Sequence, residues 1–151
     1  MGIINAVIIM FFEDLKMGTQ IEIPETVINK KDMIEFALKY DNIPLHTDEN
    51  YAKTTPFGKL IAPGVMSLMS VWSKYLEVDI MGNEFIAGNR SQTEWLKPVY
   101  AEDKLYGKAV ITNLFKRNDK NGIVELTINI CNQNGDLVII NRTQAVVKSR
   151  P

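Results

Sequence analysis

The sequence predicts an α+β fold in which an antiparallel sheet curls around one buried helix. Two observations support this prediction. Residues 63–76 are apolar on nearly every side of a helix, which indicates burial because a surface helix keeps a polar face. The second half of the 151-residue chain contains four segments rich in β-forming residues. A sheet built from these segments would cover the apolar helix.

The first half of the chain predicts a strand and an amphipathic helix. Residues 20–23 are typical of a short strand, which we expect Pro24 to end because proline has no N–H for the sheet ladder. Val27 and Ile28 are candidates to continue the sheet. Asn29 is a favourable N-cap for a helix over residues 30–40. The apolar residues of this helix recur at intervals of three and four, as on one face of a helix: Met33, Phe36, Ala37 and Tyr40.

The segment after this helix contains Asp41 and His46, the sole histidine of the chain. Five residues apart, two side chains on a regular helix or strand point in different directions. Pro44 lacks an N–H and pushes the residue before it toward extended geometry, so we expect a bent loop in which both side chains can face one space. A short helix capped by Thr47 or Asp48 is expected to follow.

Four strands are expected after the buried helix. The third alternates apolar and polar residues cleanly, as a half-buried strand does. Asn-Gly pairs within residues 118–122 and 132–136 predict hairpin turns on both sides of it. We therefore predict an antiparallel meander over residues 85–95, 104–115, 123–132 and 137–148.

Composition excludes several classes of function. With 17 basic and 18 acidic residues, the net charge of −1 provides no basic excess for nucleic acid or an anionic membrane, so we expect neither partner. The single cysteine, Cys131, excludes an intrachain disulfide framework and a multi-cysteine zinc site, and its apolar surroundings favour a buried thiol. One histidine among scattered carboxylates predicts no metal site. We expect a cytoplasmic protein.

The length predicts a single domain, for which we expect residues 12–151. Residues 1–11 are expected to form an N-terminal extension. The apolar run at residues 2–12 is shorter than the roughly 20 residues that span a bilayer, and it lacks the basic start and cleavage site of a signal peptide. Met10 is a candidate for the natural start, which would make residues 1–9 foreign to the native chain.

Four short motifs carry a resemblance to a known family. They are DNIPLHTD at residues 41–48, PFG at 56–58, APG at 62–64 and WLKPV at 95–99. In this order and spacing they resemble the MaoC-like dehydratases, the R-specific enoyl-CoA hydratase group of the hot-dog fold. The resemblance covers residues 12–148, nearly the whole chain.

The resemblance implies an enzyme that reversibly hydrates a 2-enoyl thioester of CoA or an acyl carrier. It implies a homodimer, with higher homo-oligomers left open, and no cofactor beyond the coenzyme A of the substrate. By motif position, Asp41 and His46 are the catalytic pair, and the Gly64 N–H faces the thioester carbonyl. A helix N-terminus suits this role, because its free N–H groups favour an oxyanion. Gly64 also fits a packing glycine.

The resemblance leaves the acyl and carrier contacts open. Candidates for an acyl pocket are Phe57, Met66 and Trp72. Candidates for the phosphates of CoA are Lys53, Lys59 and Lys97.

One departure from the family pattern bears on substrate class. The best-characterised hydratases of the group carry Asn where this chain has Ile43. Ile43 therefore keeps open the alternative of a non-catalytic subunit that binds acyl thioesters. Two further alternatives are a thioesterase on the same fold, against which Asp41, Pro44 and His46 argue, and a structural dimer without a ligand. Acyl length, branching, carrier, pathway and direction of the reaction are not specified by the sequence.

Overall fold

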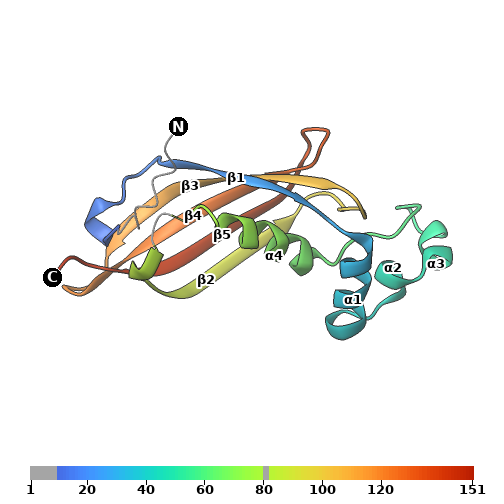
Figure 1. The fold of residues 1–151 in the computed structure, drawn as a ribbon, viewed down its shortest axis with the longest axis horizontal. Coiled ribbons are helices and arrows are strands. Elements are labelled where there is room, and N and C mark those ends of the chain that lie inside the picture. The colour runs from blue at the N-terminus through green and yellow to red at the C-terminus, as the bar shows by residue number, and fades with distance from the viewer. Residues whose placement is uncertain (1–9, 80–81) are drawn as a thin grey trace.

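The computed structural model describes residues 10–79 and 82–151 of the chain. Five antiparallel strands form one curved sheet, and helix α4 lies along one of its faces (Figure 1). Three short helices gather beyond one end of the sheet (Figure 1). The predicted α+β fold, with its sheet curled around a helix, is confirmed.

The elements follow the order expected from the sequence, with two additional 3-10 turns. Their bounds are η1 Phe12–Asp14, β1 Gln20–Val27, α1 Lys30–Tyr40, α2 Pro44–Thr47, α3 Glu49–Lys53, α4 Gly64–Tyr75, η2 Gly82–Glu84, β2 Phe85–Trp95, β3 Lys104–Lys116, β4 Asn121–Cys131 and β5 Leu137–Lys148. The predicted helix over residues 30–40 and its Asn29 cap are confirmed, since the Asn29 side chain accepts a hydrogen bond from the Asp32 N–H. Asp48 caps α3 in the same way, accepting from the N–H groups of the next turn.

The strand order is β1-β3-β4-β5-β2, which corrects the predicted four-strand meander. Only β3, β4 and β5 follow one another in space, and β2 pairs with β5 at the far edge. The segment between β2 and β3 explains this arrangement, because it forms no tight hairpin. The Leu96 N–H donates to the carbonyl of Val138 in β5, and the Val99 carbonyl accepts from the Ala62 N–H.

Two predicted boundaries are wrong. β1 continues past Pro24 to Val27 with an irregular register, and it tolerates the proline because it is an edge strand. The Asn-Gly pair at residues 121–122 begins β4 instead of forming the turn. Gly122 is needed there for packing, since a Cβ at this position would collide with the ring of Phe12. Gly135, with φ +80°, forms the second predicted turn.

The core lies between α4 and the concave face of the sheet. α4 packs against β1 and β3, and its Val71 and Tyr75 are almost completely buried. Further buried residues come from the central strands: Leu105, Ala109, Ile111, Val124, Leu126, Ile128, Ile130 and Ile139. Cys131, expected to be buried, is only partly so, because it lies at the end of β4.

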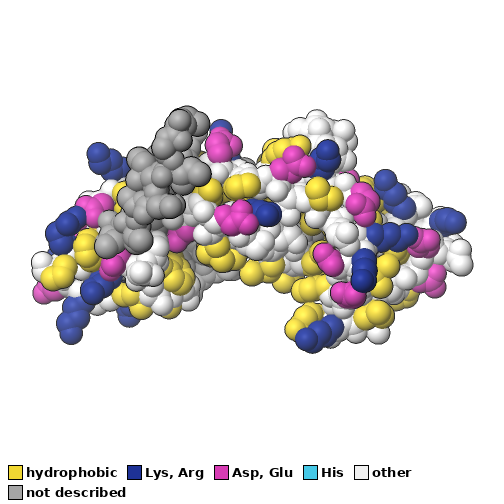
Figure 2. All heavy atoms as spheres, in the orientation of Figure 1, with side chains coloured by type: hydrophobic (Ala, Val, Ile, Leu, Met, Phe, Trp, Pro, Cys, Tyr) yellow, Lys and Arg dark blue, Asp and Glu magenta, His cyan; other side chains and the backbone are white. Residues whose placement is uncertain are grey.

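Within this chain, α4 is covered on one side only, which differs from the burial predicted by its apolar sequence. Val65 is 53% exposed and Met69 is 49% exposed. Hydrophobic side chains gather on the surface in the region of α4 in Figure 2. Strand β2 is also exposed along nearly its whole length, at the edge of the sheet. The apolar residues of α4 therefore exceed what this chain buries.

The structure describes only part of the expected N-terminal extension, residues 1–11. Residues 1–9 lie outside the described residues, whereas Met10 and Phe12 pack against the core. No helix of the described residues has the length and apolar character needed to cross a membrane.

Candidate active site

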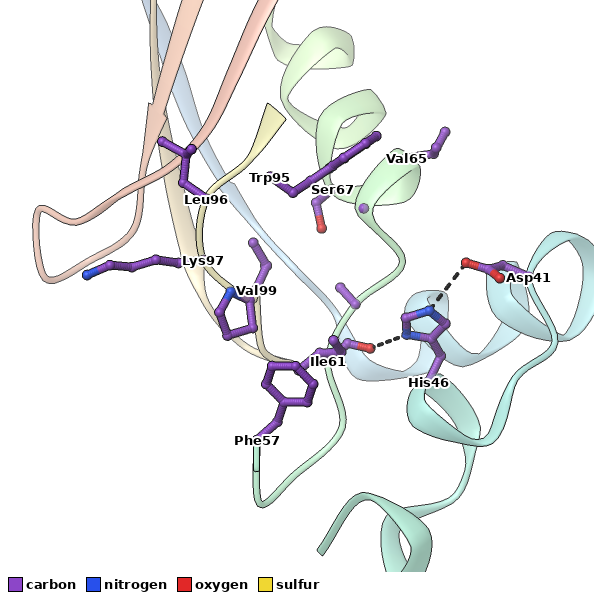
Figure 3. Close-up of a pocket in the computed structure, with 13 residues that line it drawn as sticks. Asp41, His46, Phe57, Ile61, Val65, Ser67, Trp95, Leu96, Lys97 and Val99 are labelled. Atoms are coloured by element: carbon purple, nitrogen blue, oxygen red, sulfur yellow. Dashed lines mark hydrogen bonds and ion pairs between the residues drawn. The ribbon is translucent and has the colours of Figure 1, made fainter. Parts of the chain in front are cut away.

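A cavity of about 490 Å³ opens where the helices at the end of the sheet meet the start of α4 (Figure 3). Its walls come from the α1–α2 junction, the segment leading into α4, the first turn of α4 and the chain at the end of β2. The lining is largely apolar, with a few polar side chains. The complete set of lining residues is Asp41, His46, Phe57, Ile61, Ala62, Gly64, Val65, Ser67, Trp95, Leu96, Lys97, Pro98 and Val99.

Asp41 and His46 face each other at this cavity. The Asp41 Oδ2 atom lies 3.2 Å from His46 Nε2 (Figure 3). Asp41 ends α1, and its N–H still donates to the Ala37 carbonyl. His46 lies in the one-turn helix α2 rather than in the predicted bent loop. The pair converges because Pro44 starts this new helix in a different direction.

The other ring nitrogen of His46 is held by the protein backbone. His46 Nδ1 lies 2.7 Å from the carbonyl oxygen of Ile61, and the residue is only 5% exposed. A carbonyl oxygen only accepts, so Nδ1 carries a hydrogen and donates it. Nε2 is therefore the nitrogen that faces Asp41 and the cavity, accepting in the neutral ring and donating in the charged one. Sequence reasoning missed Ile61, because any residue type supplies a backbone carbonyl.

Gly64 is the first residue of α4, and it lines the same cavity. Among the described residues, no hydrogen-bond acceptor is found for its N–H. The preceding residue, Pro63, offers no side chain that could cap the helix. A free N–H at the positive end of a twelve-residue helix can donate to a developing oxyanion.

Gly64 also has a packing role. A Cβ at Gly64 would lie 2.5 Å from Nε1 of Trp95 and 2.6 Å from its Cε2. No side chain can occupy this position while the indole remains there. The packing role expected for Gly64 is confirmed, whereas its role toward an oxyanion stays a prediction. The sequence predicted Trp95 only as the end of a strand, and the structure shows that it also lines the cavity.

The three candidates for an acyl pocket are not brought together. Phe57 lines the main cavity, whereas Met66 is buried in the core at 8% exposure. Trp72 lines a separate hollow of about 180 Å³ between α4 and the strands β2 and β5. Its ring packs against that of Tyr75, with 4.9 Å between ring centroids.

The lysine candidates divide between two places. Lys97 lines the main cavity and pairs with Asp136 at 3.5 Å. Lys53 and Lys59 border a neighbouring cavity of about 290 Å³, together with Lys30. No group of three or more His, Cys, Asp or Glu side chains suited to a metal ion occurs within residues 10–79 and 82–151.

Comparison with known proteins gives concordant matches. Residues 13–133 match the family model described as MaoC like domain. A Bacillus subtilis protein described as uncharacterized protein YdeM is 24% identical over 140 residues, or 92% of this chain and 99% of that protein. The (R)-specific enoyl-CoA hydratase of Rhodospirillum rubrum is 33% identical over 108 residues, or 71% of this chain and 73% of that enzyme.

Among solved structures, one described as a monoamine oxidase regulatory protein from Archaeoglobus superposes with a TM-score of 0.89. It is 30% identical, and the match covers 95% of this chain and 97% of that one.

Proposed function

Because this chain belongs to the MaoC-like dehydratase family, with its hot-dog fold, we propose that it adds water reversibly to a 2-enoyl thioester, using Asp41 and His46. The protein is a hydro-lyase. The observation that carries the proposal is the Asp41–His46 pair at 3.2 Å, on the wall of a cavity that also exposes the start of α4.

The pair suits the proton transfers of the reaction. Hydration requires a base to take a proton from water as its oxygen bonds to C3, and an acid to protonate C2. A water molecule beside both Asp41 Oδ2 and His46 Nε2 would supply the hydroxyl on C3 and, through the pair, the hydrogen on C2. The carbonyl of Ile61 holds the imidazole in the orientation that this requires. Dehydration follows the same steps in reverse.

Gly64 supports the charge that develops between these steps. As the C3–O bond forms, the electrons of the double bond move toward the thioester carbonyl, whose oxygen becomes an enolate. The Gly64 N–H would donate to that oxygen at the positive end of α4. Pro63 adds no competing N–H, because proline has none, and most of the cavity wall is apolar.

Lysines near the cavity support an anionic carrier for the acyl group. CoA and acyl carrier proteins both carry phosphate at the end of the pantetheine arm opposite the thioester. Lys97 stands at the cavity, and Lys53 and Lys59 stand beside the neighbouring one. The Lys59 ammonium lies 4.4 Å from the centroid of the Tyr100 ring, which positions it without neutralising its charge.

We also propose that the enzyme is a homodimer, formed along β2 and α4. An exposed edge strand pairs readily with another chain. The exposed Val65 and Met69 of α4 lie on the side that this chain leaves uncovered. A second copy that pairs with this chain at β2 would bury these side chains and would pack against the uncovered side of α4.

Ile43 does not argue against catalysis by this site. Its side chain is 44% exposed and is not among the residues that line the cavity. Its carbonyl accepts hydrogen bonds from the His46 N–H and the Thr47 hydroxyl, an ordering role that any residue type can fill. Replacing the family Asn by Ile43 therefore removes no polar group from the cavity wall.

The decisive experiment follows the absorbance of the enoyl-thioester chromophore with crotonyl-CoA, and release of free thiol in parallel. We expect chromophore loss without thiol release, and loss of this turnover in a folded His46→Ala variant. Thiol release would instead identify a thioesterase. Tight binding of acyl-CoA without either reaction would identify a binding subunit, and the absence of any CoA-dependent change in melting temperature would indicate a structural dimer.

A further inference from the structure

Two separate cavities each border both α4 and β2, one after the other along the helix. The strip between these two elements is called the α4–β2 groove below. The first is the candidate active site, which includes Gly64. The second, of about 180 Å³, is lined by α4 residues Leu68 and Trp72, which are one and two turns further along the same side of the helix. The groove therefore leads from the reacting end of a bound thioester toward Trp72.

The indole of Trp95 lines the first cavity but not the second, and the residue is 49% exposed. Trp95, Thr93 and Ser91 share one face of β2, because strand side chains alternate. Trp95 lines the first cavity and packs on Gly64, whereas Ser91 lines the second. In Figure 3 the Trp95 side chain lies across the start of α4, beside Val65 and Ser67. An acyl chain that extends along the groove from the first cavity meets this indole.

The strands supply a polar part of the lining beyond Trp95, whereas Leu68, Met69 and Trp72 of α4 make the rest of it apolar. Asn141, 1% exposed, donates from its amide nitrogen to Ser91 Oγ at 3.0 Å and to Thr93 Oγ1 at 2.9 Å. Its side-chain oxygen accepts from the Thr143 hydroxyl at 2.6 Å. Since these groups satisfy one another, the network is stable without a ligand. Covering it with methylene groups would provide no new hydrogen bond.

From this arrangement we propose that Trp95 ends the acyl-binding cavity and restricts the enzyme to short acyl thioesters. The inference rests on the proposed function, because it concerns the acyl group of the same substrate. It assigns Trp95 a role in specificity, not in the proton transfers. Trp72 was a candidate for the acyl pocket from the sequence. On this proposal it lines the second cavity, which the Trp95 indole closes to the acyl chain.

The test compares kcat/KM for crotonyl-CoA with kcat/KM for trans-2-octenoyl-CoA. We expect the wild-type enzyme to favour crotonyl-CoA by at least about tenfold, the discrimination that a few ill-fitting methylenes produce. Trp95→Ala, which joins the two cavities, is expected to shift this ratio toward octenoyl-CoA by about tenfold or more. Trp95→Phe retains an aromatic partition and should stay near the wild-type ratio.

Leu68→Ala provides a matched control, because it enlarges the second cavity while leaving Trp95 in place. Alone it should not shift the ratio. A wild-type enzyme that uses octenoyl-CoA as well as crotonyl-CoA, or a Trp95→Ala variant with an unchanged ratio, would overturn the assignment.

Binding of saturated thioesters separates this inference from the proposed reaction. Butyryl-CoA and octanoyl-CoA cannot be hydrated, so calorimetry with them reports acyl fit without turnover. A preference for butyryl-CoA that Trp95→Ala removes would support the role of Trp95 even if no hydration were observed. Hydration of crotonyl-CoA without a preference for butyryl-CoA would support the proposed reaction and would refute the proposed role of Trp95 in ending the acyl-binding cavity.

Discussion

The carboxylate of Asp41 lies 3.2 Å from Nε2 of His46, although one residue ends α1 and the other lies in α2. The two side chains differ in exposure, with His46 nearly buried and Asp41 about half exposed at 46%. The histidine is fixed by the Ile61 carbonyl, whereas the carboxylate reaches toward it from the open side of the cavity. This asymmetry allows the role of Asp41 to be tested without disturbing the core.

Asp41→Asn is expected to lower kcat/KM by about 10²–10⁴, the usual contribution of a positioned acid or base. The fold should persist, because Asn is sterically matched and the position is exposed. The measurement is chromophore loss with crotonyl-CoA, alongside thermal unfolding. Asp48→Asn is the matched control: Asp48 caps α3, does not line the cavity, and Asn caps helices equally well. Equal activity of the two variants would remove Asp41 from the mechanism.

Gly64→Ala is expected to destabilise the protein by about 1–3 kcal/mol, because the new methyl group collides with the Trp95 indole. In a Trp95→Ala background the same change should be nearly neutral, since the collision partner is gone. Urea unfolding of the four proteins in this double-mutant cycle measures the coupling. If Gly64→Ala destabilises both backgrounds equally, the contact with Trp95 is not the cause.

Glu125 should give the fold a measurable dependence on acid pH. Hydrogen bonds from the Thr112 hydroxyl and then the Gln144 amide hold the pKa of Glu125 below its ordinary value of 4.5. A lowered pKa in the folded state means that the stabilisation is present above pH 4.5 and is lost as pH falls through the folded pKa.

Glu125→Gln is accordingly expected to lower Tm at pH 7 by roughly 2–4 °C, the effect of about 1 kcal/mol in a chain of this size. The difference from wild type should narrow as pH falls below 4.5 and through the lower pKa of the folded state, where the folded carboxylate takes up its proton. Thermal scans of both proteins across this range check the prediction. A difference in Tm that stays constant with pH would show that the charge of Glu125 contributes nothing.

Met69→Glu tests the proposed dimer, because it places a charge on the uncovered side of α4. We expect light scattering to show a dimer for the wild type and a monomer for this variant, since an unpaired buried charge is costly. Leu38→Glu introduces the same charge at an exposed apolar residue of α1, where Leu38 is 57% exposed. It should leave the dimer intact. A wild-type monomer would refute the proposed interface.

The limits of the helices and strands could be predicted well wherever local interactions set them. Asn29 caps α1 because its own side chain reaches the N–H of Asp32. The alternation of apolar and polar residues along 123–132 predicted β4, because successive side chains of a strand point to opposite faces of the sheet. The motif at residues 41–48 likewise identified the pair Asp41 and His46, and with the other motifs it identified the family.

Tertiary structure alone decided which distant segments meet. Nothing local to β2 specifies its place beside β5, because its partner strand lies about 50 residues further along the chain and pairs with it from Phe85 to Trp95. The Ile61 carbonyl orients His46 through the backbone, and the Trp95 indole meets Gly64 because a curved sheet brings the end of β2 under α4. Backbone groups and long-range packing leave no pattern in residue type, so the sequence determined the chemistry of this site and the fold determined its shape.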